Sequence, residues 1–98
     1  MILKKTINYK DTLLQSLKNP EEAALYLSAA LEEEAPEAFL LALRNVAEAV
    51  GLSSVSEKSK LNRENMYRML SEKGNPEFSS LSALLKTLGL QLAVKAKE

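Results

Sequence analysis

The sequence predicts an all-α domain of five helices that ends in a short β-strand. Leu and Ala dominate its apolar residues and aromatic residues make up only 5% of it, a composition that favours helix packing. Apolar residues recur every three or four positions along most of the chain and alternate with polar ones only near the C-terminus. A length of 98 residues suits one domain, 1–98, with N-terminal helices in 1–50, further helices in 51–90 and a strand in 91–96.

The first half of the chain carries start and stop signals for helices. One helix is expected at 11–17, beginning at an aspartate that caps it. The next, 20–31, is capped by Asn19 and has proline at its first position. The third, 36–50, presents apolar residues on one face, and Gly51 stops it.

Shorter helical segments follow, separated by small polar residues. Apolar spacing indicates helices at 52–59 and 62–70, the latter capped by Asn62. Residues 73–76, Lys-Gly-Asn-Pro, form a strong helix-breaking cluster. A last helix is expected over 80–88, with leucines at the spacing of one helical face.

The tail after residue 89 alternates apolar and polar side chains, which is typical of a half-buried strand. A single strand in a helical domain has no partner for its backbone groups. We therefore expect it to pair with another copy, with another protein, or with segment 2–8. The predicted dimerisation residues are Leu90, Leu92 and Val94.

Residues 51–76 have the pattern of a DNA-reading element. Two short helices are joined by a turn of about four residues around Lys60, as in a helix-turn-helix. The second helix exposes Arg and Asn, which pair with guanine and adenine in the major groove, and the serines that begin the first helix suit phosphate oxygens. The alternative is a plain amphipathic helix with a polar outer face. The predicted DNA-binding residues are Ser53, Ser54, Asn62, Arg63, Glu64, Asn65, Tyr67, Arg68 and Lys73.

Charge is unevenly distributed although the formal net charge is +0. Residues 1–20 carry four lysines and one aspartate, and residues 21–50 carry seven glutamates against a single arginine. Residues 51–75 carry five cations against three glutamates, and residues 76–98 carry three lysines against two glutamates. An acidic middle and a mildly basic second half favour a protein with two different faces, although solvated helix surfaces with uneven charge would give the same pattern.

The absent residue types limit the possible chemistry. The chain contains no Cys and no His, which excludes disulfides, Cys/His metal sites and thiolate or imidazole catalysis. We therefore expect no enzyme, no cofactor and no metal. The N-terminus lacks an apolar run long enough for a signal peptide, and no stretch approaches the ~18 apolar residues of a membrane span. The expected location is the cytoplasm, with no membrane partner.

Two family resemblances cover most of the chain. Residues 51–90 resemble the phage-repressor-type (XRE/Cro-like) helix-turn-helix, and residues 8–94 resemble the small addiction-module antidote proteins, close to HigA-like antitoxins. At two positions the chain departs from the family pattern, with Ser56 in place of Ala and Lys60 in place of Gly. The matching segments are Asn19–Ala23, Tyr26-Leu27, Ala42-Leu43, Val46-Ala47, Asn62–Leu70, Gly74–Pro76 and Leu88–Leu90.

These resemblances imply the antitoxin of a type II toxin–antitoxin module, a homodimer that represses its own operon and binds a toxin encoded beside it. The partners implied are double-stranded DNA, the operator of that operon, and a small basic toxin. A second hypothesis keeps the helix-turn-helix fold but assigns it little DNA binding. In that case the acidic helices 20–50 and the C-terminal strand form a protein-interaction module that neutralises the toxin, and the cluster Glu32–Glu34 is its main indication.

Overall fold

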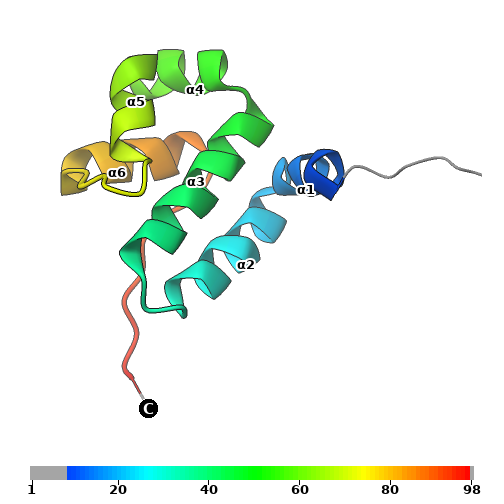
Figure 1. Cartoon of the computed structure of the whole chain (residues 1–98), viewed down its shortest axis with the longest axis vertical. Helices are drawn as coiled ribbons and strands as arrows, with labels where there is room; N and C mark the ends of the chain where they lie inside the picture. The colour runs from blue at the N-terminus through cyan, green and yellow to red at the C-terminus, as the bar shows by residue number, and fades with distance from the viewer. Residues whose placement is uncertain (1–8, 98) are drawn as a thin grey trace, which may run out of the picture.

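The computed structural model describes residues 9–97, and this part of the chain forms six helices (Figure 1). α3 lies at the centre, α2 runs beside it, and α4, α5 and α6 gather at and behind its C-terminal half (Figure 1). The helices are α1 (Tyr9–Leu17), α2 (Pro20–Leu31), α3 (Pro36–Val50), α4 (Leu52–Ser59), α5 (Arg63–Met69) and α6 (Phe78–Thr87).

The expected helix boundaries of the first half are largely confirmed. The Asn19 side chain accepts a hydrogen bond from the backbone N–H of Glu21 at 2.8 Å, so it caps α2 as predicted. Proline occupies the first turn of both α2 and α3, where its missing N–H would have no helical partner. Gly51, at φ 117°, ends α3, and α4 continues from it at an angle of 102° to α3.

A single apolar cluster joins the two halves of the fold. Leu17 from α1, Leu43 and Val46 from α3, and Val55 from α4 are almost completely buried. Met66, Leu70 and Leu84 close the same cluster from the α5 and α6 side, and none of the described polar or charged residues is buried. Burial of these side chains is the main driving force that holds α4 and α5 against α3.

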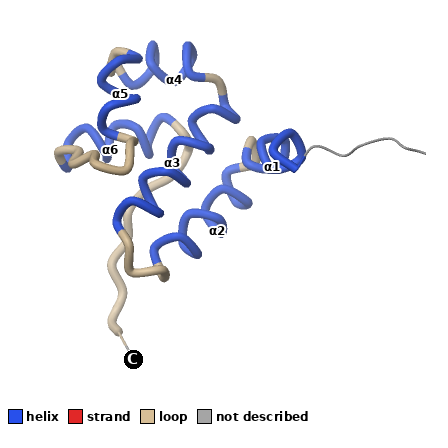
Figure 2. Tube along the Cα trace, in the orientation of Figure 1, coloured by secondary structure: helices blue, strands red, loops and turns tan. Residues whose placement is uncertain are grey.

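Two parts of the expected fold are wrong. The predicted total of five helices is wrong: six form, one for each of the six helical ranges that the sequence pattern indicates. The C-terminal β-strand over 91–96 is absent, and residues 91–97 are loop (Figure 2). A strand needs a neighbour to accept and donate its backbone hydrogen bonds, and no extended segment in 9–97 supplies one. Segment 2–8, the pairing partner considered within the chain, lies outside the described residues.

Two helix starts also differ from expectation. α1 begins at Tyr9, so Asp11 lies inside its first turn rather than capping it. α6 begins at Phe78, earlier than the expected Ser80, because the backbone N–H of Leu81 already donates to the carbonyl of Glu77 at 3.0 Å. The helix therefore begins two residues before its expected start.

Within residues 9–97, no individual helix has the length and apolar character needed to cross a membrane. The bent pair α3 and α4 meets those criteria only when the two helices are taken together.

Candidate nucleic-acid interface

α4 and α5 form a helix–turn–helix unit whose joint is Lys60. This lysine adopts the left-handed conformation, with φ 64° and ψ 22°. A residue with a Cβ is less stable there than Gly by roughly 1 kcal/mol. The turn nevertheless forms, and α5 begins directly after it.

Side-chain hydrogen bonds stabilise this turn. The Ser56 hydroxyl donates to the carbonyl of Leu61 at 2.5 Å, across the joint between α4 and α5. The backbone N–H of Leu61 in turn donates to the Ser59 hydroxyl at 3.3 Å. Ser56 and Lys60 therefore lie in one hydrogen-bonded turn, and the Ser56 bond offsets part of the strain at Lys60.

α5 has one buried and one exposed face. Met66 is buried against the core, and Leu70, which caps the helix C-terminus, is buried with it. Arg63, Asn65 and Arg68 are exposed, as expected for a helix that contacts an external partner. Glu64 is exposed on the same helix and Lys73 in the loop that follows it. The core thus fixes the orientation in which α5 presents its polar side chains.

Asn62 has a structural role that limits its part in base reading. Its side-chain oxygen accepts a hydrogen bond of 2.7 Å from the backbone N–H of Asn65 and caps α5. A bidentate contact to adenine needs that oxygen as an acceptor. Asn65, whose side chain is exposed, keeps both amide groups for such a contact.

The predicted phosphate-contacting serines lie at the start of α4. The guanidinium Nη1 of Arg63 donates to the hydroxyl of Ser53 at 3.5 Å, which links α5 to α4 on the exposed surface. Ser54 is half-buried beside it. Asn65, Arg68 and Lys73 line a groove of about 400 Å³ beside α5. The structure therefore brings the predicted residues together in two groups, one with Ser53 and Arg63 and one with Asn65, Arg68 and Lys73.

Sequence reasoning missed Arg44, which couples α3 to α5. Its guanidinium carbon lies 4.9 Å from the centroid of the Tyr67 ring, within cation–π range. The Nε of Arg44 also lies 3.8 Å from the carboxylate of Glu48 one turn along α3. Tyr67 is 37% exposed, so one ring face contacts Arg44 and part of the side chain reaches solvent. In the sequence, Arg44 stands out only as the single cation of the acidic segment. No local pattern predicts its contact with Tyr67, because the two residues are far apart in the chain.

The predicted dimerisation residues differ in environment. Leu90 is half-buried, and its backbone N–H donates to the carbonyl of Leu85 at 2.8 Å. Leu92 is 44% exposed and Val94 is 98% exposed.

Within residues 9–97, no group of three or more acidic, His or Cys side chains is arranged to hold a metal ion.

One of the comparisons with known proteins identifies a family. Residues 8–96 match the family described as "Probable addiction module antidote protein". The chain belongs to this antidote family. A relative from Haemophilus influenzae, described as an uncharacterized protein, is 36% identical over 81 residues, which cover 83% of this chain and 84% of the relative. No solved structure matches the chain.

Proposed function

We propose that this antidote is a DNA-binding transcriptional regulator, the antitoxin of a type II toxin–antitoxin module in the cytoplasm. It represses its own operon as a homodimer and neutralises a toxin encoded beside it, without catalytic activity of its own. Membership of the antidote family supports the antitoxin role. DNA binding rests on the surface formed by α4 and α5.

The observation that carries the DNA proposal is the exposed cationic and amide face of α5. Arg63, Asn65 and Arg68 are solvent-accessible, while Met66 is 1% exposed and anchors the helix to the core. Base reading requires this combination, because a side chain discriminates bases only when its helix is held in a fixed orientation. The neighbouring Ser53 and Lys73 suit contacts to phosphates on either side.

A homodimer would allow two copies of α5 to read two half-sites. Such helices lie about 34 Å apart, one turn of DNA, when they enter successive major grooves on one face. Val94, which is 98% exposed in the tail, supports a contact between copies there. Because the formal net charge is +0, we expect weak non-specific binding and a modest dependence on salt.

A gel mobility-shift titration with DNA from upstream of the protein's own operon tests the proposal. Arg63→Ala or Arg68→Ala should weaken specific binding about tenfold or more, since each removes a candidate base contact. Lys18→Ala is the matched control, because it removes one exposed positive charge at the end of α1, far from α5 (Figure 1). If both arginine variants bind as tightly as the Lys18 variant, α5 is not the reading helix.

The second candidate function is a toxin-neutralising interaction module with little DNA binding. It is favoured by the acidic side of the molecule, where Glu32, Glu33, Glu34 and Glu37 are all exposed around the α2–α3 turn. Co-expression with the small protein encoded next to it tests this function directly. Co-purification of a complex, together with no shift of operator DNA by the antidote or by the complex, would select this candidate over the regulator.

A further inference from the structure

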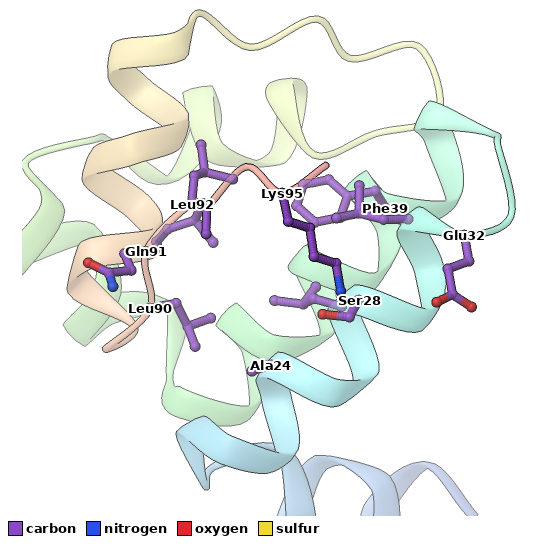
Figure 3. Close-up of a pocket in the computed structure, with 12 residues that line it drawn as sticks. Ala24, Ser28, Glu32, Phe39, Leu90, Gln91, Leu92 and Lys95 are labelled. Atoms are coloured by element: carbon purple, nitrogen blue, oxygen red, sulfur yellow. The ribbon is translucent and has the colours of Figure 1, made fainter. Parts of the chain in front are cut away.

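Two apolar grooves meet where the C-terminal tail crosses α2 and α3. One has a volume of about 460 Å³ and lies between α2, α3 and the tail, as Figure 3 shows with Ala24, Phe39, Leu90 and Leu92 around it. The other, of about 520 Å³, continues past the start of α3 to the loop before α6. Because Leu31, Phe39 and Leu92 line both, we treat them as one surface, the Leu92 groove.

The apolar side chains of the Leu92 groove are incompletely covered. Leu31 is 57% exposed and Leu92 is 44% exposed, and Phe39 between them is only half-buried. Contiguous exposed apolar surface on a small protein is typical of an interaction site. Beyond Leu90 the described tail makes no backbone–backbone hydrogen bond, and four of its residues line the groove: Gln91, Leu92, Ala93 and Lys95.

The border of the Leu92 groove is acidic. Glu32 lines its first part and Glu34 its second, and Glu33 is exposed between them. Lys95 is the one cation among the described lining residues of the Leu92 groove. An apolar floor with a negative border complements a segment that carries apolar and positively charged side chains together.

We propose that the Leu92 groove binds a cationic amphipathic segment of a partner protein, in which apolar side chains alternate with Lys or Arg. The proposal rests on the partner-binding half of the proposed function, and it adds where the partner binds and what chemistry it presents. A second copy of this chain fits less well. A two-fold contact through the groove would bring two Glu32–Glu34 clusters together, and like charges facing each other oppose association.

Fluorescence anisotropy with two labelled peptides of about 12 residues tests the proposal, one alternating Leu with Lys and the other Leu with Glu. The Leu/Lys peptide should bind and the Leu/Glu peptide should not. Glu32→Gln with Glu34→Gln should weaken binding about tenfold. Glu57→Gln with Glu72→Gln removes the same charge from exposed positions that line neither groove and should change binding less than about twofold.

A second pair of variants tests the apolar floor. Leu31→Ser should weaken binding of the Leu/Lys peptide, whereas Leu25→Ser should not, since Leu25 is 68% exposed on the same helix but lines neither groove. Equal binding by all four variants, or no binding at all, overturns the proposal. A dimer in sedimentation that Leu31→Ser alone dissociates also overturns it, because a second copy would then occupy the groove. If the wild-type protein binds the Leu/Lys peptide but does not bind operator DNA in the mobility-shift titration, only the proposed regulator function is contradicted.

Discussion

Replacement of Lys60 by Gly should stabilise the protein, because this residue holds a left-handed backbone at φ 64° and ψ 22°. An L-residue in this region is disfavoured by about 1–2 kcal/mol, and replacement by Gly removes this cost. Part of the benefit is lost again, because Gly gives the unfolded chain more conformational entropy, which folding must overcome. The expected net effect of Lys60→Gly is therefore a gain of about 0.5–1 kcal/mol in the free energy of unfolding. For a domain of this length that corresponds to a rise in Tm of roughly 2–8 °C.

The same substitution two residues earlier provides a matched control of opposite sign. Lys58 lies within the last turn of α4, where Gly destabilises a helix by about 0.5–1 kcal/mol. Lys60→Ala removes the charge but keeps the Cβ, so its stability should stay within about 0.5 kcal/mol of the wild type. Thermal and urea unfolding followed by circular dichroism at one fixed protein concentration measures all three. A loss of stability in Lys60→Gly as large as that in Lys58→Gly would refute the strained turn.

Three further substitutions check separate features by the same unfolding measurements. Asn62→Ala should lower the free energy of unfolding by about 1 kcal/mol, because it removes the cap of α5. Asn65→Ala leaves the capping oxygen in place and should lower it less. Equal losses of stability in the two variants would contradict the capping role. Gly74→Ala should destabilise by roughly 1–3 kcal/mol, since an ideal Cβ there would lie 2.1 Å from the backbone oxygen of Met69, and an unchanged Tm would contradict that crowding. Leu84→Ala should cost about 2–5 kcal/mol because the side chain is fully buried, and a loss below about 1 kcal/mol would place it outside the core.

Local chemistry made much of the helical framework predictable. Asn19 and Asn62 have the side chains that cap helices, and both accept the expected backbone hydrogen bonds. Gly51 has the positive φ that a stop at the end of α3 favours. These features depend on residues within one turn of each other, so the sequence contains the information needed to place them.

Features that depend on distant residues were not predictable in the same way. The alternation of Leu90, Leu92 and Val94 indicates a tail with one apolar side, but it does not show whether a neighbouring strand exists to pair with it. In the structure the described tail is a loop beside α2 and α3. The contact of Arg44 with Tyr67 joins two helices that are far apart in the chain. Asn62 was predicted both as the cap of α5 and as a DNA-binding residue; the cap is confirmed, and the DNA contact stays a prediction.

The neutral net charge of the chain does not conflict with DNA binding at the start of α5, because Arg63 and the Glu32–Glu34 cluster lie near opposite ends of α3. The Glu32–Glu34 cluster precedes the first residue of α3, whereas Arg63 contacts Ser53 at the start of α4, just beyond its last residue. A helix of 15 residues is about 22 Å long, and charges are screened over about 8 Å at physiological ionic strength. The glutamates therefore do little to cancel the potential at Arg63. It follows that neutralising Glu32 and Glu34 should leave operator affinity nearly unchanged, and that one rigid helix allows a cationic and an acidic surface to act independently.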